Sequence, residues 1–408
     1  MKLKCTPEDF QVDERTEYPI GPEGSFAVYR LSKRGLTTPD AIDALARRWK
    51  LDRQKISYGG LKDRHALTSQ YLTIFRGPRR ELIQTNMSLK YLGQGIRPYK
   101  PTDISENAFS LVMRDMSEEE TARAGRAAGH ALADGIPNYF DDQRFGSVSS
   151  SGEFIGRAWI EENYERCLWL ALAEPHPADR SGEKKEKQIL RDLWGQWPEC
   201  KAKLGRSHRR SIVTFLADRP GDFRGAWGCV RADLRGLYLS AFQSDLWNRI
   251  VTNIFRRVCR TDQLDTIALK TGDIVFPAGL DGDKRAELAR MFVPLPSTRI
   301  RVDPGPLEKD ITDTLAAMGL SLDQIKVKHH RDSFFSKGER ALLVRPADLT
   351  YSEGADELYP GRRRFSLSFR LPRGSYATIL VKRLTLVEDE SAGAADEESG
   401  PEDGEEGT

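Results

Sequence analysis

Strand-like patterns occur at both ends of this chain and are separated by a middle segment of different character. Residues 107–114 and 365–371 alternate apolar and polar side chains, as strands with one buried face do. Residues 151–340 instead hold most of the tryptophans and a helical pattern from Ser240 to Val258. We therefore expect one domain formed by residues 1–150 plus 341–387, with residues 151–340 inserted into it as a second domain.

Helix ends are marked at two places in the N-terminal part. Thr38 has the form of an N-cap before a proline, and apolar residues at helical spacing follow as far as Trp49. Ser117 and Glu120 have the spacing of a capping box, and Gly135 stands where a C-cap is expected. One helix is predicted after each of these caps.

Two segments between regular elements predict loops. Residues 60–66 lie between strand patterns at 56–58 and 67–74. Residues 135–146 match neither a helix nor a strand and are dense in aromatic and amide side chains. Three candidate residues lie on these loops: Asp63, Tyr139 and Arg144.

Charge is distributed unevenly along the chain. Residues 388–408 contain ten Asp and Glu and no Lys or Arg, so a chain of net charge +2 has a body of +12. Such a body suits a polyanionic partner, although charge spread evenly for solubility gives the same total. The acidic tail is expected to be disordered. One hypothesis is that it shields the basic body from non-specific RNA, which truncation after Val387 would test.

Missing patterns exclude several classes of protein. The five cysteines are widely spaced and only His329 and His330 adjoin, so we expect neither disulfides nor a metal site. The sequence has no Walker, Rossmann or Gly-x-Ser-x-Gly pattern, which argues against a nucleotide cofactor and against α/β-hydrolase chemistry. No apolar run approaches the roughly 20 residues that span a bilayer, and the N-terminus lacks a signal sequence. We expect a cytoplasmic protein without a membrane partner.

Asp63 is the first candidate for chemistry. It lies between Lys62 and Arg64 on a loop preceded by two glycines, so its carboxylate is expected to be ionised and accessible. Such a carboxylate can act as a nucleophile or as a base. Taken alone, this tripeptide is more often a solvated turn with local ion pairs.

Aromatic and amide side chains close to polar or Gly/Pro-containing segments could bind an unpaired base. Phe10, Phe109, Tyr139 and Tyr376 could stack on it, and the amide of Asn107 could read its edge. Taken singly, the aromatics more often belong to a core, and Asn107 more often caps a turn.

Basic side chains are candidates for phosphate contacts. Arg144 could hold a phosphate or a catalytic carboxylate. Residues 201–210 and 362–364 are also rich in Lys and Arg. An ordinary solvated surface is the commoner meaning of such residues.

Five segments, in order, resemble the motifs of the TruD family of pseudouridine synthases. They are Lys4-Cys-Thr-Pro-Glu-Asp-Phe10, Gly60-Leu-Lys-Asp-Arg-His-Ala-Leu-Thr-Ser-Gln70, Asn107-Ala-Phe-Ser-Leu-Val-Met-Arg114, Gly135-Ile-Pro-Asn-Tyr-Phe-Asp-Asp-Gln-Arg-Phe-Gly146 and Leu371-Pro-Arg-Gly-Ser-Tyr-Ala-Thr378. The resemblance implies an α/β (α+β) fold. Its catalytic domain would have a mixed, mainly antiparallel sheet, interrupted by a TruD-type insertion domain. An RNA-binding cleft would lie between the two domains.

The resemblance also implies roles for particular residues. Asp63 matches the family's essential aspartate. Positions that contact the target uridine are matched by Phe10, Asn107 and Tyr376, and motif positions near it by Lys4, Glu8 and Phe109. The aromatic at 376 is Phe in some relatives, so its hydroxyl is not expected to be essential. Asp141 stands where relatives often carry Gly, which departs from the pattern.

The implied activity converts a uridine of tRNA, typically uridine 13 in the D arm, to pseudouridine. The bond from N1 to C1′ breaks and the base rejoins through C5, so we expect no cofactor. The carboxylate could attack C1′, add to C6 or remove the 2′ proton. An extruded base would be held by stacking and edge contacts. We expect a monomer.

Two other classes of function are weighed against this one. An RNA-binding module or tRNA chaperone of the same fold would lack activity, and the motif around Asp63 counts against it. A two-carboxylate glycosidase would need a second acid near Asp63, for which Glu8 is the candidate, and would release free uracil.

Overall fold

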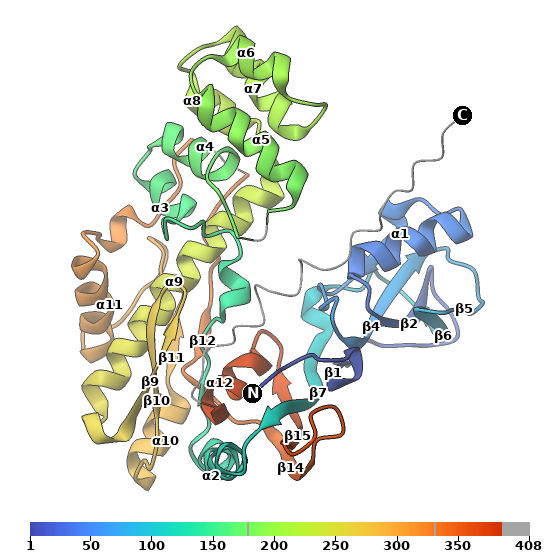
Figure 1. Cartoon of the computed structure of the whole chain (residues 1–408), viewed down its shortest axis with the longest axis vertical. Coiled ribbons are helices and arrows are strands. Elements are labelled where there is room, and N and C mark those ends of the chain that lie inside the picture. Colours follow the sequence, from blue (N-terminus) through green and yellow to red (C-terminus); the bar gives the residue numbers. More distant parts are fainter. Residues whose placement is uncertain (178, 330–331, 386–408) are drawn as a thin grey trace. The chain divides into compact units, whose positions relative to one another are not determined.

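The computed structural model describes residues 1–177, 179–329 and 332–385 (Figure 1). These residues form two compact units, which we call the sheet unit and the helical unit. The sheet unit comprises Met1–Ile136 and Val344–Thr385, and the helical unit comprises residues 137–343. The predicted acidic tail, residues 388–408, lies outside the described residues.

The sheet unit is built on a nine-stranded sheet in the order β14-β15-β7-β1-β4-β2-β6-β5, with β3 paired to β4. Strands β1 and β4 run parallel, and the other pairs of this sheet are antiparallel. The predicted mixed, mainly antiparallel sheet is therefore confirmed. The strands are β1 (Phe10–Thr16), β2 (Phe26–Arg34), β3 (Ile56–Tyr58), β4 (Leu67–Phe75), β5 (Leu82–Gln84), β6 (Met87–Gly95), β7 (Ile104–Met116), β14 (Ala347–Ala355) and β15 (Arg363–Pro372).

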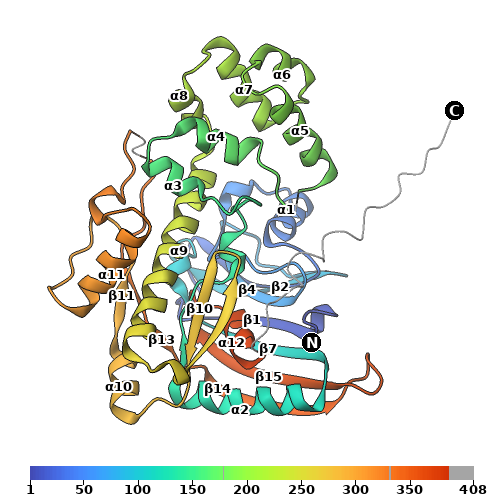
Figure 2. The same ribbon diagram turned by 60° about the vertical axis from the view of Figure 1, so that its left-hand side comes forward.

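Helices cover two parts of one face of this sheet (Figure 2). Helix α1 (Thr38–Trp49) packs Ile42 and Leu45 against Tyr29 of β2 and Leu72 of β4. Helix α2 (Glu118–Asp134) packs on β14 and β15 and against α12 (Ala377–Thr385). The candidate site lies on the same face, around β1 at the middle of the sheet.

Local predictions in the sheet unit hold with small differences. The N-cap of α1 is Thr37, whose side chain accepts a hydrogen bond from the Asp40 amide, and Thr38 is already helical. The capping box of Ser117 and the C-cap at Gly135 are confirmed, because Gly135 has a φ of 80°. The apolar run after residue 376 forms helix α12.

The helical unit is built around α9 (Ala232–Val258), which begins eight residues before the predicted start at 240.

Two short elements interrupt the predicted 135–146 loop: β8 (Ile136–Pro137) and a 3-10 turn (Asp142–Phe145). None of the helices in the described ranges is both long enough and apolar enough to cross a membrane. The other helices are α3 (Ile155–Ile160), α4 (Tyr164–Leu172), α5 (Ser181–Asp192), α6 (Trp197–Lys203), α7 (His208–Asp218), α8 (Phe223–Gly228), α10 (Gly282–Arg290) and α11 (Pro306–Ala317). The remaining strands are β9 (Leu264–Leu269), β10 (Gly272–Pro277), β11 (Phe292–Pro294), β12 (Glu339–Ala341) and β13 (Leu343–Val344).

Tyr139 lies in the core of the helical unit. Its side chain has no exposed surface, and its hydroxyl donates a 3.0 Å hydrogen bond to the Val275 carbonyl. The ring also packs edge-on against Phe276. Stacking of Tyr139 on an RNA base, considered from the sequence, is therefore wrong, and the core alternative is correct.

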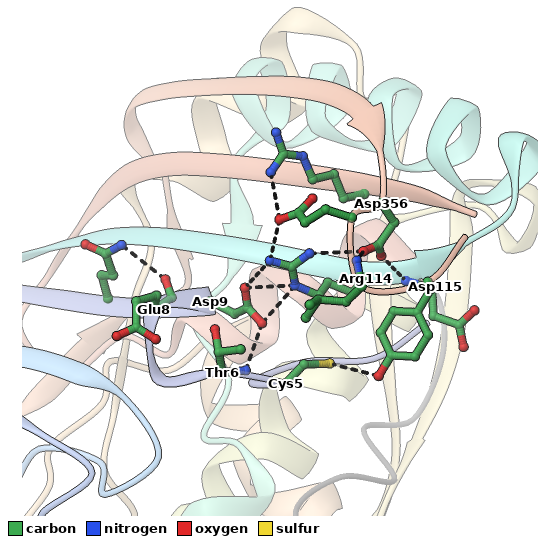
Figure 3. Close-up of polar contacts among 12 residues, drawn as sticks. Cys5, Thr6, Glu8, Asp9, Arg114, Asp115 and Asp356 are labelled. Carbon is green, nitrogen blue, oxygen red and sulfur yellow. Dashed lines mark hydrogen bonds and ion pairs between the residues drawn. The ribbon is translucent and has the colours of Figure 1, made fainter. Parts of the chain in front are cut away.

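A buried arginine joins the two ends of the chain in the sheet unit. Arg114 of β7 donates hydrogen bonds to both carboxylate oxygens of Asp9, each at 2.9 Å, and to Asp356 at 3.0 Å. Figure 3 shows Asp9 and Asp356 reaching this guanidinium from separate segments. The hydrogen bonds to Asp9 raise the pKa of Arg114 above its ordinary value. Since Asp9 ends the 3-10 turn Pro7–Asp9, this cluster holds the turn between residues 4 and 10 against the sheet.

Replacing Arg114 with Met should destabilise the protein by about 3–5 kcal/mol, because it leaves the buried Asp9 carboxylate without its cation. Arg364→Met is the matched control, since Arg364 shares the partner Glu357 but is 42 % exposed. It should cost about 1 kcal/mol or less. Urea unfolding of both variants measures the difference. Equal losses would show that burial of the Arg114 cluster adds nothing.

Candidate active site

The loop of residues 60–66 is fixed at its start by buried hydrogen bonds. The Thr38 hydroxyl accepts a 2.9 Å bond from the Lys62 amide and donates a 2.8 Å bond to the Gln70 side chain. Gln70 in turn donates to the Gly60 carbonyl at 3.1 Å. Helix α1 and strand β4 therefore both hold the backbone that leads to Asp63.

The buried ammonium of Lys33 holds the backbone of the same loop. It donates hydrogen bonds to three carbonyl oxygens: Leu36 at 2.6 Å, Asp63 at 2.7 Å and Lys62 at 3.2 Å. The side chain is only 1 % exposed. Burial lowers the pKa of Lys33 to about 8, although the negative charge of Asp63 opposes this shift. A protonated amine has three N–H donors, which matches the three carbonyls.

The carboxylate of Asp63 remains accessible on this fixed backbone. Its side chain is 37 % exposed, and one oxygen lies 3.1 Å from the Lys4 ammonium. That ammonium also sits 4.3 Å from the centre of the Phe10 ring, as a cation–π contact. Lys4 has a φ of 54°, in the left-handed region. The two motifs at residues 4–10 and 60–70 thus meet at one ion pair.

A second set of contacts links this loop to strand β7. The Lys62 ammonium lies 3.0 Å from Glu14 and donates a 2.5 Å hydrogen bond to Oδ1 of Asn107. Glu14 has no exposed surface and also accepts hydrogen bonds from the Tyr71 amide at 3.1 Å and the Tyr99 hydroxyl at 3.0 Å. Asn107 lies opposite Glu14 in the pairing of β1 and β7.

Two more predicted residues lie on neighbouring parts of the sheet unit. Phe109 is half-buried and stacks on Phe369 of β15, with ring centres 5.3 Å apart. Tyr376 is half-buried in the turn between β15 and α12. Since Leu371 of β15 pairs with Asn107, this turn leaves the sheet beside the strand that carries Asn107 and Phe109.

The other predicted site residues have partners of their own. Glu8 is exposed and forms an ion pair with Arg34 at 2.6 Å, which lowers the pKa of Glu8. Arg144 belongs to the helical unit, where its Nε donates to the Ser244 hydroxyl at 3.2 Å. Within the 362–364 patch, Arg362 binds Asp115 at 2.8 Å.

Three residues of this site were not singled out from the sequence for the roles they have: Glu14, Lys33 and Lys62. A signal was present for two of them. In β1, Glu14 lies on the same buried face as Phe10. In β2, Lys33 lies on the same buried face as Tyr29. A charged side chain on the buried face of a strand needs hydrogen-bond or ion-pair partners, so its presence in the pattern indicates a polar site.

Raising the pH from about 8 to 10.5 should stabilise the wild type relative to Lys33→Met. The folded pKa of Lys33 lies below its ordinary value of 10.5, so the unfolded chain binds more protons in this window and stability rises with pH. The gain is at most about 3 kcal/mol. Urea unfolding of both proteins across the window measures it. A difference that stays flat or falls would contradict the lowered pKa.

Known proteins resemble this chain along nearly its whole length. The sequence model of the family tRNA pseudouridine synthase D (TruD) matches residues 1–384. A Methanococcus maripaludis protein named "Probable tRNA pseudouridine synthase D 1" is 30 % identical over 395 residues, covering 94 % of this chain and 99 % of the relative. A Leptospira interrogans protein named tRNA pseudouridine synthase D is 30 % identical over 400 residues, covering 94 % and 96 %.

A solved structure agrees with the sequence matches. The crystal structure of a Methanosarcina mazei protein described as a tRNA pseudouridine synthase D (TruD) superposes with a TM-score of 0.72 at 26 % identity. It covers 95 % of this chain and 94 % of that protein. The resemblance found in the sequence motifs is thus confirmed, and the chain belongs to the tRNA pseudouridine synthase D (TruD) family of isomerases.

Proposed function

We propose that this protein converts uridine 13 in the D arm of tRNA to pseudouridine, with Asp63 as the catalytic carboxylate. The observation that carries the proposal is the state of Asp63: a backbone held by buried Lys33 presents a 37 % exposed carboxylate beside the Lys4 ammonium. The family membership and the names of the relatives support tRNA as the substrate.

The chemistry requires one carboxylate and a held base. Asp63 attacks C1′, adds to C6 or removes the 2′ proton, and in each route the bond from N1 to C1′ breaks. The base then turns, and C5 bonds to C1′ as the Asp63 carboxylate is restored. The proton on C5 leaves to water, and N1 takes a proton from water. The reaction has no net oxidation or hydrolysis, so we propose that it proceeds without a cofactor.

The surrounding residues have separate roles in this proposal. Phe10 is only 3 % exposed, and the Lys4 ammonium lies over its ring face. Its contact with the uridine is therefore limited to a ring edge. Its main role in this proposal is to hold Lys4 in position. Stacking on the base falls to the half-buried Phe109 and Tyr376, and reading of its edge to Asn107.

Charged residues outside this cluster have supporting roles. Glu8, bound to Arg34, orders the turn next to Phe10, and Arg144 contributes to tRNA binding from the helical unit. We propose the sheet unit as the catalytic domain and the helical unit as the insertion domain, acting in a monomer.

Asp63→Asn should fold and bind tRNA but lose activity by about a thousandfold or more, because an amide is a poor nucleophile and a poor base. The assay counts tritium released from C5-labelled unmodified tRNA, without added metal or nucleotide. Asp43→Asn is the control, since Asp43 is exposed on α1 and pairs with Arg53. Turnover by Asp63→Asn close to the wild-type rate would reject Asp63.

Measurements of tRNA binding and of free uracil beside this assay separate the proposal from its alternatives. Tight tRNA binding by the wild type without tritium release would indicate an RNA-binding module. Release of free uracil would indicate a glycosidase.

A further inference from the structure

The side-chain amide of Asn107 can meet a ligand either as a donor or as an acceptor. Its oxygen accepts hydrogen bonds and its NH₂ group donates them, and a half turn about the last side-chain bond exchanges the two. Asn107 is half-buried on β7, so part of the side chain is open to a ligand. The orientation of this amide therefore decides which chemical groups the site accepts.

Lys62 sets that orientation. An ammonium group has donors and no acceptor, so the Asn107 atom that lies 2.5 Å from Lys62 must be the oxygen. If the amide turned over, its NH₂ group would face a cation at the same distance. Such a contact is repulsive.

Glu14 prevents Lys62 from moving away. Its carboxylate is fully buried and lies 3.0 Å from the Lys62 ammonium. Separation of this ion pair would leave a buried carboxylate without its cation, which costs more than the loss of the one hydrogen bond from Lys62 to Asn107. The ion pair of Glu14 and Lys62 therefore fixes the orientation of the Asn107 amide, a neutral side chain on another strand.

The remaining group of Asn107 is its NH₂. Within the described parts of the chain, the bond to Lys62 is the side-chain hydrogen bond that Asn107 makes. Both N–H bonds of Nδ2 are therefore available to a ligand. They can bind a carbonyl oxygen, and they cannot bind an amino group.

The geometry points to Glu14 and Lys62 as positioning residues that make Asn107 a fixed donor, so that the site selects uracil over cytosine at C4. The two bases share a carbonyl at C2. At C4 uracil has an oxygen acceptor and cytosine an amino donor, whereas N3 is a donor in uracil and an acceptor in cytosine, so a donor favours uracil where it faces C4. This inference rests on the proposed function, because it takes Asn107 as a contact of the target base.

The test compares two tRNA transcripts that differ by U or C at the position which the wild type modifies. Tritium release and product mapping by the wild type come first, because they establish the function and the position. Dissociation constants for both transcripts are then measured with chains that carry Asp63→Asn, which prevents conversion of the U transcript during binding.

Two variants isolate the amide orientation. The chain with Asp63→Asn alone is the control, because it keeps both Glu14 and Lys62 in place beside Asn107. Glu14→Gln with Lys62→Met removes the ammonium without leaving a buried charge, so it guards against loss of folding. In this double variant Asn107 is free to turn and to accept a bond from cytosine.

The control should bind the U transcript about tenfold or more tightly than the C transcript. In the double variant this ratio should fall to within about twofold, mainly through tighter binding of the C transcript. A ratio near one in the control, or an unchanged ratio in the double variant, overturns the inference while the function stands. No product from the wild type would overturn the proposed function and this inference with it.

Discussion

The candidate site depends on one buried charge, the carboxylate of Glu14 at the centre of the sheet. A carboxylate without exposed surface is unfavourable unless a cation and hydrogen-bond donors surround it. The backbone of β4 supplies one donor at Tyr71, and the cation is Lys62. Because Lys62 precedes Asp63, pairing of the buried charge also draws the loop that carries Asp63 onto the sheet. A requirement of the core thus places the Asp63 carboxylate.

The strand order gives this requirement its effect. Strand β1 lies between β7 and β4, so it has the segment with Asn107 on one side and the strand that follows the Asp63 loop on the other. The pairing of β1 with β4 is parallel, which lets the turn before β1 and the loop before β4 meet at the same edge. Lys4 and Asp63 lie on those two segments and form their ion pair there. Parallel pairing of this kind needs a long connection, and β2, α1 and β3 provide it.

Much of the fold and part of the site follow from sequence, for physical reasons that differ by residue. Alternation in β7 and β15, the capping box at Ser117 and the helical spacing in α1 are local, so short windows show them. The motif around Asp63 identified the loop. The partners of that loop were not predictable from such windows, because Lys33 and Glu14 gain their roles only when strands far apart in sequence pair. Tyr139 was likewise not predictable from a short window. It is an aromatic loop residue, and its burial depends on packing against α9 and β10.

The pairing of β7 with β15 has a consequence for how the chain is made. Arg114 and Asp356 are 242 residues apart, and the whole helical unit is synthesised between them. Until β15 emerges from the ribosome, β7 has an unpaired edge with free backbone donors and acceptors, which is the kind of surface that mispairs with other chains. The helical unit is continuous in sequence and can complete its core first, whereas the sheet unit cannot. β15 therefore closes the nine-stranded sheet only after the whole helical unit has been made, and a nascent chain stalled before residue 363 holds the Asp63 loop without a complete sheet.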